Sequence, residues 1–387
     1  MKIQIILIAF FLFFLSSIKG EDYKSFICNL GLNLEEITVI TEDRYILSIW
    51  ELTSKDINNR NGKSIILQHG LLDGAFTWVI LEEKSLAKLL CDEGYKVYLP
   101  NIRGSKFSKS HLDYDISLNS EFWDFSFDEI AEYDLTAIIS LIKKRDNVEK
   151  LDYIGHSQGT LTFFLNYMSN PDFLENSINH FIGLATVANV NNATHFILNL
   201  LKTSNLLKII PIKNFLSFPT EIGQVLVPFC EGKGKILCKS ILKMCFGGLS
   251  IDTGRVDYDR LGKNIFLYEP GGTSIQNVKH WIQVYSAKKL IKYDYGSKSE
   301  NKKHYGIEDP PEYDLNNMKK YSIKSMVTIS DTDPFCNPND TLDFLKKIED
   351  QSIVEVMNLT NYDHIDYLWS DSAYEEIYPK ILNFLDH

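Results

Sequence analysis

Short apolar runs recur along the chain with helical stretches between them. Their length and residue types are those of buried β-strands. The runs are Ile65 to Gln68, Lys96 to Leu99, Leu151 to Gly155, Phe181 to Val187, Ser325 to Ile329 and Ile353 to Met357. Because strands that alternate with helices form parallel sheets, the pattern predicts an α/β protein with a mostly parallel central sheet and helices on both faces.

An earlier pair of runs predicts an antiparallel hairpin at one edge of this sheet. Ile37 to Ile40 and Tyr45 to Trp50 flank the polar segment 41–44. Two strand-like runs separated by a short polar segment are typical of a hairpin.

The alternation breaks once, between the predicted strand that ends near Val187 and the one that begins near Ser325. This stretch contains apolar clusters, among them Leu206 to Ile212 and Ile222 to Phe229, but no strand alternation. An insertion of this length should have structure of its own, so we predict a cap over the active edge of the sheet. The predicted organisation is a first core part at 21–187, a cap and lid insertion at 188–310 and a second core part at 311–387.

Residues 1–20 have the layout of a secretory signal peptide. Lys2 precedes an apolar run from Ile5 to Leu15, and small and polar residues follow as far as Gly20. A membrane-spanning helix needs about 20 apolar residues, so the run is too short to span a bilayer. We expect a mature chain that begins near Glu21, follows the secretory pathway and has no transmembrane segment. A retained anchor is the alternative.

Composition narrows the class of protein. In 387 residues, 44% are hydrophobic and 24% are charged, which is typical of a globular protein. The formal net charge of -11 provides no basic surface for a phosphate backbone, so nucleic acid is not an expected partner. A secretory route permits disulfides and N-glycosylation. Asn-x-Ser/Thr triplets stand at Asn192, Asn339 and Asn358.

The strongest chemical signal is the sequence GHSQG at residues 155–159. It follows the predicted strand Leu151 to Ile154 and precedes a helical run from Thr160 to Met168. This is the G-x-S-x-G pattern in its strand, turn and helix context, which lifts a serine above the edge of a sheet. The helix dipole next to it favours developing negative charge. The pattern predicts Ser157 as a nucleophile.

A nucleophilic serine needs a base, and in this arrangement the acid and the histidine follow it in the chain. His364 lies just beyond the last predicted strand, where a loop can reach back to Ser157. His280 is better interpreted as a packed histidine, His304 as a solvated one, and His387 is too near the chain end to be held rigidly. We therefore predict His364 as the base.

The acid and the oxyanion donors come from two loops that follow predicted strands. Asp331 and Asp333 both follow the strand that ends at Ile329, and spacing alone does not choose between them. An oxyanion needs one backbone N–H from the residue after the nucleophile, which is Gln158, and one from the loop at 69–72, where Leu71 is the natural donor. His69 is expected to shape that loop through hydrogen bonds.

Metal and nucleotide chemistry find no support in the sequence. The H-E-x-x-H, C-x-x-C and Walker patterns do not occur, and the Gly271-Gly272 pair does not follow a predicted strand. We expect no cofactor and no metal.

Several spaced blocks together resemble the acid lipases, a family of α/β-hydrolases that includes gastric lipase and lysosomal acid lipase. The resemblance runs from about Ile37 to Phe384. The blocks are His69 to Leu72, Asn101 to Gly104, Glu121 to Glu129, Gly155 to Thr160, Pro270 to Ser274 with His280 and Trp281, and His364 with Asp366.

The resemblance implies an α/β-hydrolase fold with a cap and lid, and hydrolysis of triacylglycerols or cholesteryl esters at a lipid–water interface. It implies a triad of Ser157, Asp333 and His364, with Asp333 preferred to Asp331 because Pro334 follows it, as in the family's acid loop.

The resemblance also bears on the cysteines and on the first hairpin. It implies a cap disulfide between Cys230 and Cys238, with Cys245 as a neighbouring free thiol, and it marks a lid from about 200 to 251. Arg44 stands where the family usually has glycine, so we expect a different turn there.

Alternatives remain at this stage. A catalytically silent hydrolase-fold protein that binds a lipid or a partner is one, and a peptidase on the same fold is another. The apolar clusters of the predicted lid could also simply pack the cap.

Overall fold

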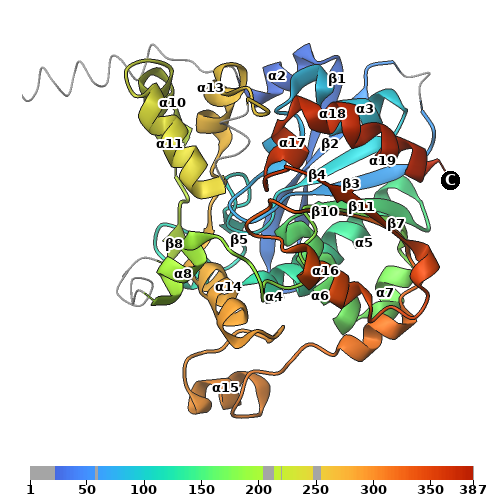
Figure 1. Cartoon of the computed structure of the whole chain (residues 1–387), viewed down its shortest axis with the longest axis vertical. Coiled ribbons are helices and arrows are strands. Elements are labelled where there is room, and N and C mark those ends of the chain that lie inside the picture. Colours follow the sequence, from blue (N-terminus) through green and yellow to red (C-terminus); the bar gives the residue numbers. More distant parts are fainter. Residues whose placement is uncertain (1–21, 57–59, 204–212, 219, 247–253, 387) are drawn as a thin grey trace, which may run out of the picture.

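The centre of the molecule is a twisted sheet with helices on both faces (Figure 1). The computed structural model describes residues 22–56, 60–203, 213–218, 220–246 and 254–386, so the predicted signal peptide lies outside it. The described strands run in the order β1-β2-β4-β3-β6-β7-β10-β11, with β5 paired to β2. They are β1 (Leu32–Ile40), β2 (Tyr45–Ser54), β3 (Ser64–Gln68), β4 (Lys96–Pro100), β5 (Ser110–His111), β6 (Leu151–His156), β7 (Ile178–Leu184), β10 (Lys324–Ser330) and β11 (Val354–Leu359).

Most of the sheet is parallel, as predicted. The pairs β3/β4, β3/β6, β6/β7, β7/β10 and β10/β11 are parallel, whereas β1/β2 and β2/β4 are antiparallel. Every residue of β3 and of β6 is buried, which explains why these strands appear in the sequence as continuous apolar runs. The fold class predicted from the alternation is confirmed.

Two strand ends are determined by residues whose backbone has a positive φ. The first hairpin turns at Arg44, whose φ of 76° lies in the left-handed region that favours glycine. Strand β7 ends at Leu184 rather than at the predicted Val187, because Ala185 takes a φ of 45° and turns the chain out of the sheet. The Val187 N–H then donates to Thr160 Oγ1, 2.8 Å away, instead of continuing a ladder.

Helices cover the sheet on both sides (Figure 1). On one side lie α3, α17, α18 and α19, and on the other α5, α6, α7 and α16. The bounds of the helices outside the long insertion are α2 (Tyr23–Asn29), α3 (Leu86–Asp92), α4 (Phe127–Glu129), α5 (Leu135–Asp146), α6 (Gln158–Ser169), α7 (Pro171–Glu175), α16 (Pro338–Leu345), α17 (Asp366–Trp369), α18 (Asp371–Glu376) and α19 (Tyr378–Leu385).

The stretch between β7 and β10 is mostly helical and extends to one side of the sheet (Figure 1). Within it, α10 packs on α13, α14 packs on α8, and β8 pairs with β9. No helix in the described ranges has both the length and the apolar character needed to cross a membrane. The described elements are α8 (Phe196–Thr203), β8 (Asn214–Phe215), α10 (Thr220–Glu231), α11 (Lys235–Phe246), α13 (Tyr258–Tyr268), β9 (Thr273–Ser274), α14 (Ile275–Ala287) and α15 (Lys298–Tyr305).

A disulfide joins α10 to α11. Cys230 and Cys238 are bonded, which confirms the pairing that the resemblance implied. We name the two helices and this link the clipped hairpin. The side chain of Cys245 lies outside the described residues.

Candidate active site

Ser157 occupies a sharp turn between a strand and a helix. Strand β6 ends at His156 and α6 begins at Gln158, so Ser157 alone makes the turn, with φ 52° and ψ -118°. A non-glycine residue in this region stores strain, which is common at functional sites. The flanking glycines are required by space. A Cβ on Gly155 would lie 2.8 Å from the Gly159 backbone, and one on Gly159 would lie 2.5 Å from the Gln68 carbonyl oxygen.

Three loops bring Ser157, His364 and Asp333, the predicted triad residues, close together. Ser157 Oγ lies 2.7 Å from His364 Nε2, and His364 Nδ1 lies 2.9 Å from Asp333 Oδ2. Because a carboxylate can only accept, the imidazole donates from Nδ1, which leaves Nε2 to accept from the serine hydroxyl. All three side chains are buried. The arrangement can therefore pass the serine proton to the imidazole.

The environment of Asp333 keeps it ionised. Burial raises the pKa of its carboxyl, but the neighbouring His364 and the backbone N–H groups of Phe335 and Cys336 lower it, and the net direction is downward. Asp331, the other candidate acid, is exposed and accepts instead from the Asn361 N–H at 3.0 Å. The structure brings only Asp333 to the imidazole.

The remaining histidines separate as expected. His280 is buried in α14 and stacks on Phe127, with ring centroids 3.8 Å apart. His304 is exposed and stacks on Tyr295. His387 lies outside the described residues. His69 shapes its loop as predicted, because its Nδ1 donates to the Gly70 carbonyl at 2.9 Å and its Nε2 accepts from the Ile102 N–H at 3.3 Å.

The two candidate oxyanion donors lie next to the serine. Gln158 is the first residue of α6, so its N–H is one of the amides that has no partner within the helix. The loop that carries Leu71 passes directly beside the serine, since a Cβ on Gly70 would lie 3.1 Å from Ser157 Cβ. Leu71 and Ser157 line one pocket.

Sequence reasoning missed how the Gln158 side chain is held. Its Oε1 accepts from Asn277 Nδ2 at 3.1 Å and from Trp281 Nε1 at 2.8 Å. Both donors belong to α14, so a helix from the long insertion fixes the residue that follows the nucleophile. The spacing of four between Asn277 and Trp281 places them on one helix face, but nothing in the sequence names their partner.

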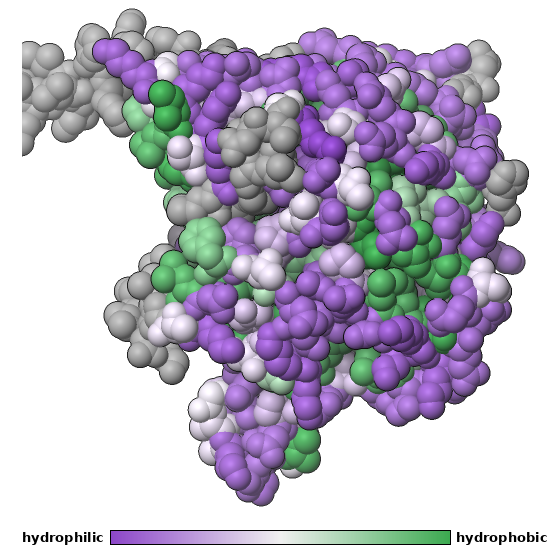
Figure 2. Space-filling view, viewed as in Figure 1, coloured by the Kyte–Doolittle hydropathy of each residue, from purple (hydrophilic) through white to green (hydrophobic). Residues whose placement is uncertain are grey.

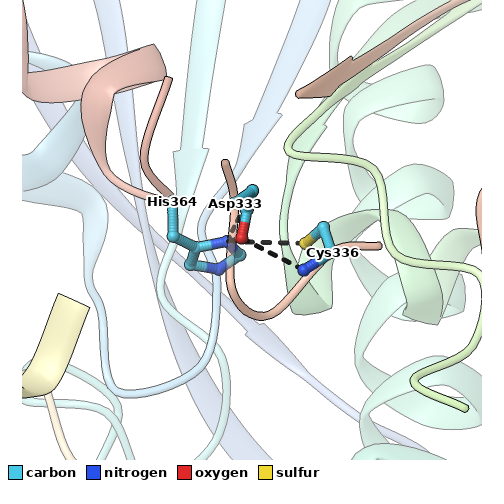
Figure 3. Close-up of side chains that lie close together, drawn as sticks. All are labelled: Asp333, Cys336 and His364. Atoms are coloured by element: carbon cyan, nitrogen blue, oxygen red, sulfur yellow. Dashed lines mark hydrogen bonds and ion pairs between the residues drawn. The ribbon is translucent and has the colours of Figure 1, made fainter. Parts of the chain in front are cut away.

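Cys336 was also missed. Its Sγ lies 3.4 Å from His364 Nδ1 and 3.2 Å from the Ala185 carbonyl oxygen, and Figure 3 shows it beside Asp333 and His364. These three residues are close enough to suggest a metal site. However, burial raises the pKa of the Cys336 thiol, and metals bind the thiolate form. The cluster of Asp333, Cys336 and His364 is therefore better explained as hydrogen bonding around the catalytic histidine than as a metal centre.

His156 holds the base from behind. Its Nε2 donates to the His364 carbonyl at 2.8 Å. Burial and the nearby His364 ring lower the pKa of His156 to about 3, so it is neutral at ordinary pH. The histidine of GHSQG therefore supports the loop that carries His364.

Comparisons with known proteins show the family to which the chain belongs. Residues 23–82 match the model described as the partial alpha/beta-hydrolase lipase region, and residues 63–207 match the alpha/beta hydrolase fold. Gastric triacylglycerol lipase of Bos taurus is 35% identical over 92% of this chain and 88% of its own length. The chain belongs to the acid lipase family. It is a serine carboxylic ester hydrolase, a lipase.

Other lipases and a solved esterase structure are also similar to this chain. Human gastric triacylglycerol lipase is 34% identical over 92% of this chain and 88% of its own, and human lipase member J is 33% identical over 91% and 95%. Among solved structures, an esterase of Exiguobacterium antarcticum has a TM-score of 0.53 at 11% identity, covering 91% of this chain and 100% of its own. At that identity the likeness shows the α/β-hydrolase fold alone.

Proposed function

We propose that this lipase hydrolyses neutral lipid esters, either triacylglycerols or cholesteryl esters, through an acyl-enzyme on Ser157. The observation that carries the proposal is the 2.7 Å separation of Ser157 Oγ and His364 Nε2, with Asp333 behind the imidazole at 2.9 Å. The names of the relatives support the substrate class, since several are gastric triacylglycerol lipases.

The mechanism follows from the roles that these atoms can take. Ser157 Oγ attacks the ester carbonyl carbon while His364 takes its proton, and Asp333 holds the imidazole tautomer and stabilises the imidazolium. The backbone N–H groups of Leu71 and Gln158 stabilise the oxyanion. The imidazolium then protonates the departing alkoxide. Water, activated by the same base, releases the fatty acid from Ser157. The steps need no cofactor.

The proposed partner is a lipid–water interface, and the surface of the clipped hairpin supports it. Figure 2 shows an apolar area over α10 and α11. Exposed side chains there include Ile222, Leu226, Phe229, Ile236, Leu237 and Ile241. We infer that residues 188–310 form a cap and that the stretch from about 200 to 251, part of which lies outside the described residues, acts as its lid.

The proposed destination is the secretory pathway, either outside the cell or in the lysosome. The layout of residues 1–20 and the Cys230–Cys238 disulfide support this route, because disulfides persist in oxidising compartments. The three triplet asparagines, Asn192, Asn339 and Asn358, are exposed, as glycosylation requires.

The test is to label purified protein with a fluorophosphonate and to compare it with Ser157→Ala. We expect labelling and ester hydrolysis to disappear together in a folded variant, since loss of a triad member costs on the order of 10^4-fold or more. Labelling that persists in Ser157→Ala would overturn the assignment. Assays on triolein, cholesteryl oleate and a short-chain ester at acidic and neutral pH then determine the substrate, and a folded wild-type protein that neither labels nor cleaves any of them would be a silent binder.

A further inference from the structure

Two carboxyl groups that the triad does not use line the pocket beside Ser157. They belong to Asp73, in the loop that carries Leu71, and to Glu269, at the end of α13 in the long insertion. Glu269 is 7% exposed, and Asp73 is partly exposed. The two side chains interact with each other, and Glu269 also interacts with the Gly271 backbone. The pair therefore lies where the insertion meets the loop of a candidate oxyanion donor.

The backbone of this loop is strained next to Leu71. Leu72 has a φ of 63°, in the left-handed region that is unfavourable for a residue with a side chain. Its carbonyl accepts from the Gly271 N–H at 2.7 Å, and a Cβ on Gly271 would lie 2.2 Å from the Asp73 carbonyl oxygen. A strained conformation persists only where its surroundings hold it. The insertion therefore helps to hold the Leu71 N–H in place.

Two further contacts join the same two segments. Tyr268, directly before Glu269, stacks on Phe76 with ring centroids 3.8 Å apart. Gly74, directly after Asp73, lies against the Glu269 carboxyl group, since a Cβ on this glycine would lie 3.9 Å from Glu269 Oε1. Close contacts thus flank the carboxyl pair on both segments, so attraction or repulsion between the two carboxyl groups acts directly on this interface.

Burial and proximity make it costly to ionise both carboxyl groups. Burial and the neighbouring Asp73 raise the pKa of Glu269 well above its usual range. Burial raises the pKa of Asp73 to about 6, although the hydrogen bond from Glu269 lowers it. Two carboxyl groups in contact keep one proton between them at pH values where an isolated carboxyl group is ionised. Once that proton leaves, two negative charges face each other across the interface.

Two titratable groups from other elements oppose this effect. Lys106, in the loop after β4, donates from Nζ to the Leu267 carbonyl at 2.7 Å and favours the ionised form of Glu269. His364, in the loop after β11, favours the ionised form of Asp73. The net direction of the pKa remains upward for both carboxyl groups, because burial has the larger effect.

We propose that Asp73 and Glu269 are positioning residues that hold the Leu71 loop in its catalytic conformation while they share a proton. When rising pH transfers this proton to solvent, repulsion between the two carboxylates loosens the contact between insertion and loop, and the Leu71 N–H moves away from the oxyanion. The inference rests on the proposed ester hydrolysis at Ser157 and adds a cause for slower turnover at high pH. The loss should appear in kcat rather than in KM, because the oxyanion forms only as the ester is attacked.

The experiment measures kcat on 4-nitrophenyl butyrate, dissolved below its solubility limit, after subtraction of the uncatalysed rate. The readout is the ratio of kcat at about pH 8 to kcat at about pH 5. Gln cannot ionise but can still donate to Asp73. We therefore expect Glu269→Gln to raise the ratio about tenfold, a part of the loss on the order of 10^2-fold that follows removal of one oxyanion donor.

Glu349→Gln is the matched control, because it removes an equal charge from an exposed position outside the pocket lining. It should keep the wild-type ratio, and titration of His364 affects all three proteins alike. An unchanged ratio in Glu269→Gln would overturn the proposal, since a purely structural role of Glu269 would change kcat equally at both pH values. A ratio raised equally by Glu349→Gln would also overturn it, since net charge alone would then explain the rise.

If Glu269→Gln does not fold, Asp73→Asn provides the measurement. It removes the other charge of the pair, so the same rise in the ratio is expected and the same outcomes would contradict it. A wild type that cleaves the ester at neither pH would instead count against ester hydrolysis at Ser157 itself, so the two failures remain distinguishable.

Discussion

The catalytic residues and the clipped hairpin are built on contrasting principles. Ser157, Asp333 and His364 are buried and joined by hydrogen bonds, and Cys336 and His156 hold the base from two further directions. The hairpin instead exposes apolar side chains, with Ile236 81% and Leu237 56% exposed. Chemistry requires fixed distances, whereas contact with lipid requires a surface that gives up water only on docking. A change in either region should therefore damage a different part of the activity.

The largest effect is expected at the acid of the triad. Asp333→Asn should lower kcat on the order of 10^4-fold, because an amide no longer fixes the imidazole tautomer. The loss should be equal on a dissolved short-chain ester and on an emulsion, since both pass through the same atoms. Steady-state kinetics on the two substrates measures it.

Asp331→Asn is the matched control on the same loop. Its side chain is exposed and only accepts from Asn361, so activity should stay within a few fold of wild type. The reverse ranking of the two variants, in proteins of equal stability, would transfer the acid to Asp331.

An intermediate effect is expected on the stability of the protein, at His280 in α14. This helix of the long insertion packs against the catalytic residues and holds the Gln158 side chain. His280 donates from Nε2 to the Ile291 carbonyl at 2.8 Å, with Asp128, Glu129 and Lys292 nearby. Burial lowers the pKa of His280 to about 4. Because the unfolded chain binds this proton at a higher pH, the free energy of unfolding should fall as pH drops from about 6.5 toward 4, by up to about 3 kcal/mol from this group.

His280→Gln should flatten that part of the stability curve, since an amide can still donate to Ile291 but does not titrate. Chemical unfolding at a series of pH values provides the measurement. Parallel curves for the wild type and the variant would mean that His280 does not carry this pH dependence.

The smallest effect on activity is expected from a substitution on the clipped hairpin. Ile236→Glu should lower activity on emulsified ester about tenfold, because a charge replaces apolar area that would leave water on docking. Hydrolysis of a dissolved ester should remain within about twofold. Ser299→Glu, on the exposed face of α15, adds the same charge away from the hairpin and serves as control. Equal losses of activity on the emulsified and the dissolved ester would contradict a role of the clipped hairpin in contact with lipid.

The strand pattern and the order of the triad could be predicted because each depends on local sequence. Buried parallel strands such as β3 must be apolar throughout, and a serine between two glycines after a strand has a recognisable form. The catalytic roles of Ser157, Asp333 and His364 stay predictions, although the fold brings their side chains together.

The rest could not be predicted because it depends on contacts between distant segments. Asp331 and Asp333 share a loop, and only the folded chain shows which carboxylate turns toward the imidazole. The long insertion packs on a core loop where the Gly271 N–H donates to the Leu72 carbonyl, and no periodicity in the sequence relates these two residues. The anchoring of Gln158 by α14 has the same origin.

The turn at Ser157 tolerates substitution differently at the serine and at the glycines that flank it. The flanking glycines have no room for a side chain, so their replacement removes fold and activity together. Ser157 itself occupies a backbone conformation that glycine would adopt with less strain. Replacement of Ser157 by glycine should therefore give a more stable but inactive protein. Loss of hydrolysis at Ser157 therefore need not cost stability, whereas the two glycines remain necessary for the fold in an inactive protein as well.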